Sequence, residues 1–143
     1  MVSLDLASDS APLYGGVESG GTKIVCLVGS GPDDIRAEST FPTGSPDVAL
    51  TKAIDFFKTS QEECGPIAAV GFASFGPVDL RADSPTFGHV TRTPKEGWSS
   101  VDDVGLMKRA LGKPVAFDTD FNGAGIGEFE WGAGRGLVNF VYI

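Results

Sequence analysis

The order of apolar and polar positions in the first half of the chain predicts three strands, a helix and a fourth strand. Apolar residues alternate with polar ones in three early segments bounded by glycine turns, at 14–19, 22–29 and 34–41. A helix is expected next, because apolar residues at helical spacing follow Ser45-Pro46, a pair typical of an N-cap and a first helical position. Gly65-Pro66 would end this helix, and the continuous apolar run at 67–73 predicts a strand buried on both faces.

The second half of the chain continues this alternation after a long insertion. Residues 75–98 are rich in Gly, Pro, Thr and Asp, which predicts an irregular loop with at most a short hairpin. Three regular elements are expected after it: a helix over 101–111, a buried strand over 114–118 and a small-residue helix over 122–131. An antiparallel meander followed by β-α-β units predicts an α/β domain with a mixed sheet over 14–143, preceded by a loose leader over 1–13.

Composition and charge narrow the classes of function. The chain has 143 residues with 11 basic and 19 acidic side chains, a formal net charge of −8. An acidic domain without a basic patch is a poor partner for nucleic acid, so a bound nucleotide would depend on Mg²⁺ and backbone N–H donors. Cys26 and Cys64 lack the spacing of a metal site, and no apolar run predicts a membrane span or a secretory signal. We therefore expect a cytoplasmic protein without a membrane partner.

Two short motifs could carry chemistry, and the residues alone leave each with a second interpretation. Gly20-Gly21-Thr22 joins the first two strands, either as a plain hairpin turn or as a loop whose N–H groups and hydroxyl line phosphates. Asp118 and Asp120 lie where the strand at 114–118 ends. Asp120 could cap the following helix or act as a reactive carboxylate.

The long loop offers further candidates with equally plain alternatives. Ser74–Pro77 follows a buried strand at its carboxyl end, where open α/β sheets bind ligands, although a strand-ending turn would have the same composition. Trp98 could anchor the loop by packing or form a platform for a sugar. His89 is the only histidine, so a loop role is expected and a histidine-based metal site or triad is not.

Four segments follow the order of a known family. They are 15–23 (GGVESGGTK), 71–79 (GFASFGPVD), 93–98 (TPKEGW), and 118–124 (DTDFNGA) with Gly127-Glu128 behind it. Together they resemble the ROK sugar kinases, most closely the fructokinase branch, and the resemblance extends to Trp131. It implies a ribonuclease-H-like or actin-like ATPase half-domain. The implied activity of the full-length protein is ATP-dependent phosphorylation of a free hexose, with fructose as the first expectation.

The resemblance also implies roles for individual residues. Asp120 would be the general base that accepts the proton of the attacking sugar hydroxyl. Glu18 would hold Mg²⁺ through water, although most of the superfamily has Asp at that place. Asp118 is expected to be a structural partner. The residues implied to bind ATP are Gly20, Gly21, Thr22, Lys23 and Glu18. Those implied to contact the sugar are Gly76, Pro77, Thr93, Trp98 and Asn122.

Other parts of the family's pattern do not occur in this sequence. They are the second glycine-rich phosphate loop, the Glu-x-x-Gly-His sugar motif and the cysteine cluster for structural zinc. Residues 138–143 resemble the strand that leads into the second loop. The chain is therefore expected to be the amino-terminal lobe of a two-lobed kinase and inactive alone. The full-length protein is expected to be a homodimer, with structural zinc only in the carboxy-terminal lobe.

Two other classes remain as alternatives. Sugar-responsive transcriptional regulators of the same family place a helix-turn-helix domain before the first strand, and the 13 residues before Tyr14 are too few for one. The chain could also be a non-catalytic sugar-binding remnant. Retention of Asp120 argues against a loss of catalysis in the parent protein.

Overall fold

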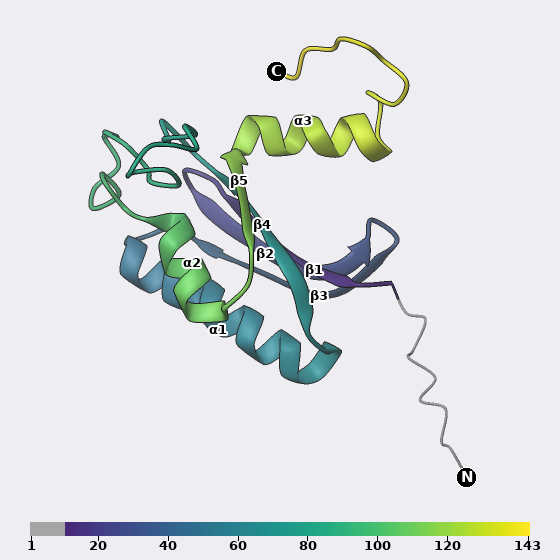
Figure 1. Cartoon of the computed structure of the whole chain (residues 1–143), viewed down its shortest axis with the longest axis horizontal. Coiled ribbons are helices and arrows are strands. Elements are labelled where there is room, and N and C mark those ends of the chain that lie inside the picture. Colours follow the sequence, from purple (N-terminus) through teal and green to yellow (C-terminus); the bar gives the residue numbers. More distant parts are fainter. Residues whose placement is uncertain (1–10) are drawn as a thin grey trace.

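The computed structural model of the chain describes residues 11–143, which form a mixed five-stranded sheet flanked by helices (Figure 1). The strands lie in the order β3-β2-β1-β4-β5. The elements are β1 Leu13–Ser19, β2 Lys23–Gly31, β3 Asp34–Pro42, α1 Pro46–Cys64, β4 Ile67–Ser74, α2 Asp103–Leu111, β5 Val115–Thr119 and α3 Asp120–Trp131. The meander and the β-α-β units follow the order that the sequence predicts.

The strand directions bring two loops and the start of α3 to one edge of the sheet. β1, β4 and β5 run parallel, and β2 pairs antiparallel with both β1 and β3. The last residues of the three parallel strands, Ser19, Ser74 and Thr119, are neighbours in the register. The segments that follow these residues therefore leave the sheet together, at the edge where open α/β sheets bind ligands.

α1 and α2 pack on one face of the sheet and form the core with it (Figure 1). Gly15 permits the close approach of α1 to β1, because a Cβ at this position would lie 2.7 Å from Cε1 of Phe57. Cys26 is fully buried in the same core, as its place in an apolar strand predicts. Burial raises the pKa of the Cys26 thiol to about 12, so this thiol stays protonated.

Two helix starts and one helix cap differ in detail from expectation. α2 begins at Asp103 instead of 101, because the Asp102 side chain accepts the Gly105 N–H and caps the helix. α3 begins at Asp120 instead of 122, and Thr119, not Asp120, is its N-cap. Ser45 occupies the N-cap position of α1, but within the described part of the chain its side chain forms no capping hydrogen bond.

Two expectations about the ends of the chain differ from the structure. Residues 1–10 of the expected leader lie outside the described residues, and Leu13 already belongs to β1. Residues 138–143 do not form the expected strand, since no strand in 11–143 lies beside them to complete a ladder. They run along α3 instead, where Phe140 stacks on Phe129 with 6.2 Å between ring centroids (Figure 1). Within 11–143, the helices fall short of the length and apolarity that crossing a membrane demands.

Candidate functional site

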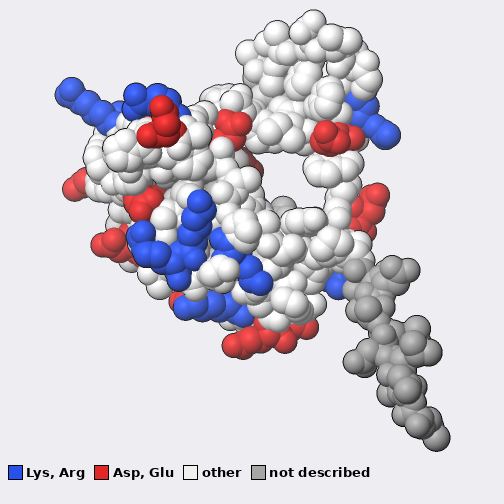
Figure 2. Space-filling model, in the orientation of Figure 1, with Lys and Arg blue, Asp and Glu red and all other residues white. Residues whose placement is uncertain are grey.

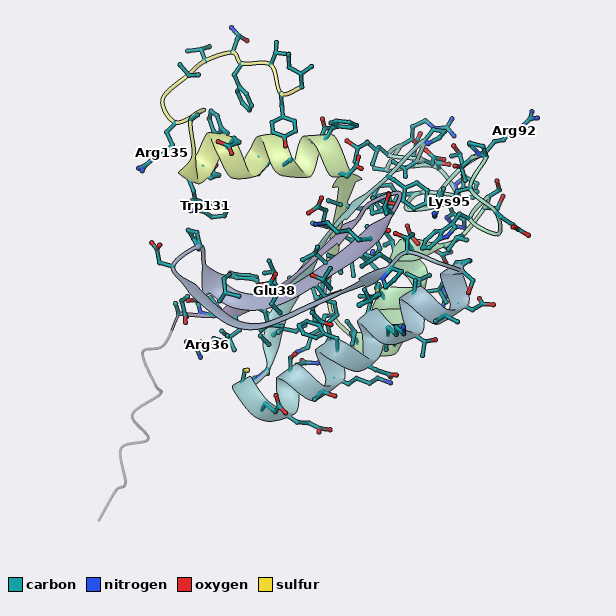
Figure 3. All side chains as sticks on the ribbon, turned by 180° about the vertical axis from the view of Figure 1, so that it is seen from behind. Arg36, Glu38, Arg92, Lys95, Trp131 and Arg135 are labelled. Atoms are coloured by element: carbon teal, nitrogen blue, oxygen red, sulfur yellow. The ribbon has the colours of Figure 1, made fainter. Side chains whose placement is uncertain are left out.

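A cleft of about 580 Å³ separates α3 from the sheet face that α1 and α2 leave free. Figure 2 shows an opening between α3 and the sheet, on the side of α3 away from the end of the chain. Small residues on the sheet side, among them Gly16, Gly71 and Ala116, leave this space unfilled. Trp131, at the end of α3, points from the helix toward the sheet (Figure 3). The cleft walls are therefore mostly apolar.

Carboxylates mark the end of the cleft at the carboxyl edge of the sheet. Glu18 pairs with Ala73, and Ala73 pairs with Asp118, so the three side chains share one face in one row. The backbones of Glu18 and Asp118 are two strand spacings apart, roughly 10 Å. α3 closes over the row, because a Cβ at Gly123 would lie 2.7 Å from the Cβ of Ala73. This arrangement leaves a polar end to an otherwise apolar cleft.

Asp120 lines the same cleft from the first turn of α3. Its Oδ1 accepts the Phe121 N–H at 2.9 Å, and Oδ2 has no hydrogen-bond partner among residues 11–143. Nδ2 of Asn122 donates to Oδ1 of Asp118 at 2.7 Å, which fits the structural role that the sequence leaves open for Asp118. The strand–helix junction thus holds Asp120 with one carboxylate oxygen available.

The turn between β1 and β2 is open at its tip. A Cβ at Gly21 would meet no atom within 4 Å, and Thr22 is exposed. The Gly-Gly pair suggests positive φ angles, but neither Gly20 nor Gly21 has one. The turn is held instead by the Gly20 N–H, which donates to the Lys23 carbonyl at 2.9 Å, and by the Thr43 hydroxyl, which donates to the Gly20 carbonyl at 2.7 Å. Neither a positive φ nor packing within residues 11–143 requires a glycine at position 21, and the tip of the turn is accessible.

Lys95 connects the long loop to this turn and was not foreseen as a site residue. Its Nζ donates to the Gly21 carbonyl at 2.7 Å, and Figure 3 shows it on the loop. A cation therefore lies beside the turn in a chain whose net charge is −8. The TPKEGW motif contains Lys95, but a lysine in a polar loop carries no signal that separates a site residue from a solvated one.

The long loop is irregular, as expected, yet it is ordered around Asp79. The Asp79 carboxylate is buried and accepts hydrogen bonds at 2.6 to 3.0 Å from Arg81, Ser84 and Thr86. The Arg81 guanidinium, with the two hydroxyls, holds the pKa of Asp79 well below its usual range. This network fixes the loop without regular secondary structure.

None of the implied sugar residues lines the cleft, and Asn122 instead borders a second pocket beside α3. Gly76 and Pro77, joined by a cis peptide bond, follow β4 at the carboxyl edge of the sheet, and neither they nor Thr93 line the cleft. Trp98 is fully buried, with Nε1 donating to the Gly44 carbonyl at 2.9 Å and its ring packed edge-on against Phe75. Burial of this kind favours the anchoring role for Trp98.

The charges outside the cleft add one feature that the sequence interpretation omits. Figure 2 shows Lys and Arg side chains gathered over α1 and α2, where Lys108 and Arg109 lie in the last turn of α2. Cations at a helix carboxyl end oppose the negative end of its dipole, which is a stabilising placement. The expectation of a chain without a basic patch did not foresee this local group.

The residues present fit a magnesium nucleotide by their chemistry. Mg²⁺ prefers oxygen ligands and usually keeps several waters, which suits Glu18 at the polar end of the cleft. Among residues 11–143, no three His, Cys, Asp or Glu side chains converge to hold a metal ion by themselves. The open Gly20–Thr22 turn and Lys95 supply an accessible backbone and a cation for phosphate oxygens.

Comparisons with known proteins find a matching family and fructokinases among the relatives. Residues 14–143 match the pattern of a family described as the ROK family. A fructokinase of Lactococcus lactis subsp. cremoris is 38% identical over 130 residues, which are 91% of this chain and 42% of the relative. A fructokinase of Zymomonas mobilis subsp. mobilis is 39% identical over 132 residues, 92% of this chain and 44% of the relative. The chain thus spans less than half the length of these relatives.

Solved structures of ROK family proteins have the fold of this chain. A ROK family glucokinase from Streptomyces griseus, solved in complex with glucose and AMPPNP, superposes with a TM-score of 0.73 at 26% identity. The match covers 87% of this chain and 38% of that one. The expected fold class, a half-domain of the actin-like ATPase type, is confirmed.

Proposed function

Because the chain belongs to the ROK family, we propose that the whole protein transfers the γ-phosphoryl group of Mg·ATP to a free hexose, with fructose as the first candidate. The two fructokinase relatives support the choice of sugar. The observation that carries the proposal is the position of Asp120, which lies in the first turn of α3 and lines the cleft beside Glu18 and Asp118.

Asp120 acts in this proposal as the general base. Its Oδ2 accepts a hydrogen bond from the reacting sugar hydroxyl and orients that oxygen toward the γ-phosphorus. As the new P–O bond forms in line, the proton passes to the carboxylate and the bond from phosphorus to the β–γ bridging oxygen breaks, which releases ADP. Asn122 is restrained through Nδ2 by Asp118, so its amide oxygen is available to a second sugar hydroxyl.

The hairpin and the long loop bind the two substrates. The backbone of Gly20 and Gly21, with the hydroxyl of Thr22, contacts ATP phosphates, and Lys23 and Lys95 add positive charge there. Glu18 would hold Mg²⁺ through water, and an ion bound there would supply positive charge for the phosphoryl oxygens. Gly76, Pro77 and Thr93 are assigned to the sugar side. Trp98 serves the site by anchoring the loop.

We also propose that the whole protein is a cytoplasmic homodimer whose structural zinc lies outside the present residues. The family resemblance is the support for this. Light scattering of the full-length protein gives the oligomeric state, and elemental analysis of the full-length protein beside this chain locates the zinc. A monomer, or zinc bound by this chain alone, would contradict the assignment.

Product formation tests the proposed reaction. The full-length protein is incubated with Mg·ATP and, separately, with fructose, glucose or mannose, and sugar phosphate is measured by mass spectrometry. We expect sugar phosphate from the parent protein and from variants whose cleft is intact, and we expect it to form fastest with fructose. Asp55→Asn is the matched control, since it removes an exposed carboxylate on α1 away from the cleft. A folded protein that forms no sugar phosphate from any of the three hexoses contradicts the proposal.

A further inference from the structure

Three buried polar side chains lie directly beneath the two loops assigned to ATP and sugar. Ser19 ends β1, Ser74 ends β4, and the two residues are partners in the parallel register. Asp103, the first residue of α2, places its Oδ2 3.2 Å from the Ser74 hydroxyl oxygen. All three residues are fully buried, on the sheet face that α1 and α2 cover. None of them touches the cleft.

The hydrogens available in this cluster decide the protonation state of Asp103. The Ser74 hydroxyl has one hydrogen but lies within hydrogen-bond distance of two acceptors, the Phe75 carbonyl at 3.0 Å and Oδ2 of Asp103. Oδ1 of Asp103 has no hydrogen-bond partner among residues 11–143. An ionised carboxylate here would be buried with one oxygen unpaired, which is costly. A protonated carboxyl instead donates to Ser74, and Ser74 donates to Phe75.

The surroundings favour the neutral carboxyl as well. Burial, the largest cause, raises the pKa of Asp103 to about 7, against the opposing effect of the Ser74 hydrogen bond and with a smaller contribution from the neighbouring Asp102 charge. Asp102 faces Arg109 at 3.3 Å and His89 at 3.7 Å. The buried side chains of α1 carry no ionisable group; they are Ala49, Leu50, Ala53, Phe57 and Ser60.

We propose that Asp103, as a neutral hydrogen-bond donor, is a positioning residue that couples the sugar loop to the phosphate hairpin. The Asp103–Ser74 contact fixes the Phe75 carbonyl, and the Phe75 N–H donates to the Ser19 carbonyl at 2.7 Å. Ser19 leads directly into the Gly20–Thr22 turn, and Phe75 leads into Gly76-Pro77. One buried chain of hydrogen bonds therefore sets the spacing of the two loops. This role rests on the proposed kinase function.

Kinetics of the full-length protein test the positioning role. Asp103→Asn keeps a donor to Ser74, whereas Asp103→Ala removes it. At pH 6 we expect Asp103→Ala to lose about tenfold in kcat/KM for the sugar, the scale of one buried hydrogen bond, while Asp103→Asn retains the parent value. Between pH 6 and 8, kcat/KM of the parent should fall relative to that of Asp103→Asn as Asp103 ionises. Ser74→Ala should abolish this difference, because it removes the acceptor that both side chains use.

Thermal melting gives a readout that does not depend on turnover. The unfolded chain releases the Asp103 proton near its ordinary pKa of 3.8, and the folded chain holds it to about 7. The parent should therefore lose melting temperature relative to Asp103→Asn as pH rises between these values, and the difference should stay constant above them. The titration of Asp103 in the folded chain does not depend on the proposed kinase function, so it should be observed even if that function is wrong. A melting difference that does not change from pH 4 to 8 overturns the proposal, and so does an Asp103→Asn variant as impaired at pH 6 as Asp103→Ala.

Discussion

At the scale of single residues, position in the sheet decides what a side chain can do. Glu18 and Asp118 share a row only because β1 and β5 both pair in parallel with β4. Asp120 leaves that row because the chain turns into α3 after Thr119. Two glycines also differ by position: Gly21, at the tip of a hairpin, has open space beside it, while a Cβ at Gly123 would press against the sheet.

Gly21→Val tests the phosphate role of the hairpin. The added side chain meets no protein atom within 4 Å of its Cβ and no positive φ opposes it, so we expect a folded protein. Its bulk at the turn should raise the KM for ATP by about tenfold or more and leave the KM for sugar nearly unchanged. Gly31→Val is the matched control, since a Cβ at Gly31, at the far end of β2, also meets nothing. Equal KM values for ATP in both variants would show that the turn has a structural role and does not bind phosphate.

At the scale of elements, the sequence predicts the helices and strands that have a local apolar pattern. It does not predict conformations that depend on tertiary contacts. Periodicity and turn residues place the strands and helices near their observed bounds, because each has a local apolar pattern. Residues 138–143 have the same strand-like pattern but form no strand, because a strand also needs a neighbour. Asp103 carries no local signal at all, since an acidic residue in a first helical turn is usually solvated.

The long loop gives a prediction with a defined pH dependence. Its contacts depress the pKa of Asp79, so the ionised network stabilises the fold at pH values above the ordinary pKa of 3.8, and this contribution is lost as pH falls below it. We expect Asp79→Asn to lower the melting temperature by a few degrees at pH 7 and progressively less on acidification. Asp83→Asn, exposed in the same loop, is the control. A melting shift that is equal at pH 3 and pH 7 would show that the charge is unimportant.

At the scale of the whole molecule, the chain forms one side of the proposed active site. Its cleft brings together Glu18, Asp118 and Asp120, and the nucleotide base has no assigned contact in it. Apolar side chains near the end of the chain are strongly exposed: Phe121 65%, Trp131 60%, Val138 95%, Val141 82% and Ile143 105%. Exposed apolar surface of this extent favours association.

We therefore expect the 143-residue chain alone to form no sugar phosphate and to self-associate. Transfer requires both substrates to be enclosed and aligned, and this chain encloses neither. Mass spectrometry after long incubation with Mg·ATP and each hexose measures the product, and light scattering measures association. Product that scales with chain concentration and disappears in Asp120→Asn would show that these residues suffice for catalysis.

The role of Asp120 is the central claim, and the Asp120→Asn variant of the full-length protein tests it most directly. The substitution preserves shape and the first turn of α3 but removes the proton acceptor. The account predicts that kcat falls by roughly 10²–10⁴-fold while sugar affinity, measured by calorimetry, is nearly unchanged. Asp55→Asn, an exposed carboxylate on α1, serves as the control for a lost charge. Turnover of Asp120→Asn within a few-fold of the parent would contradict the account.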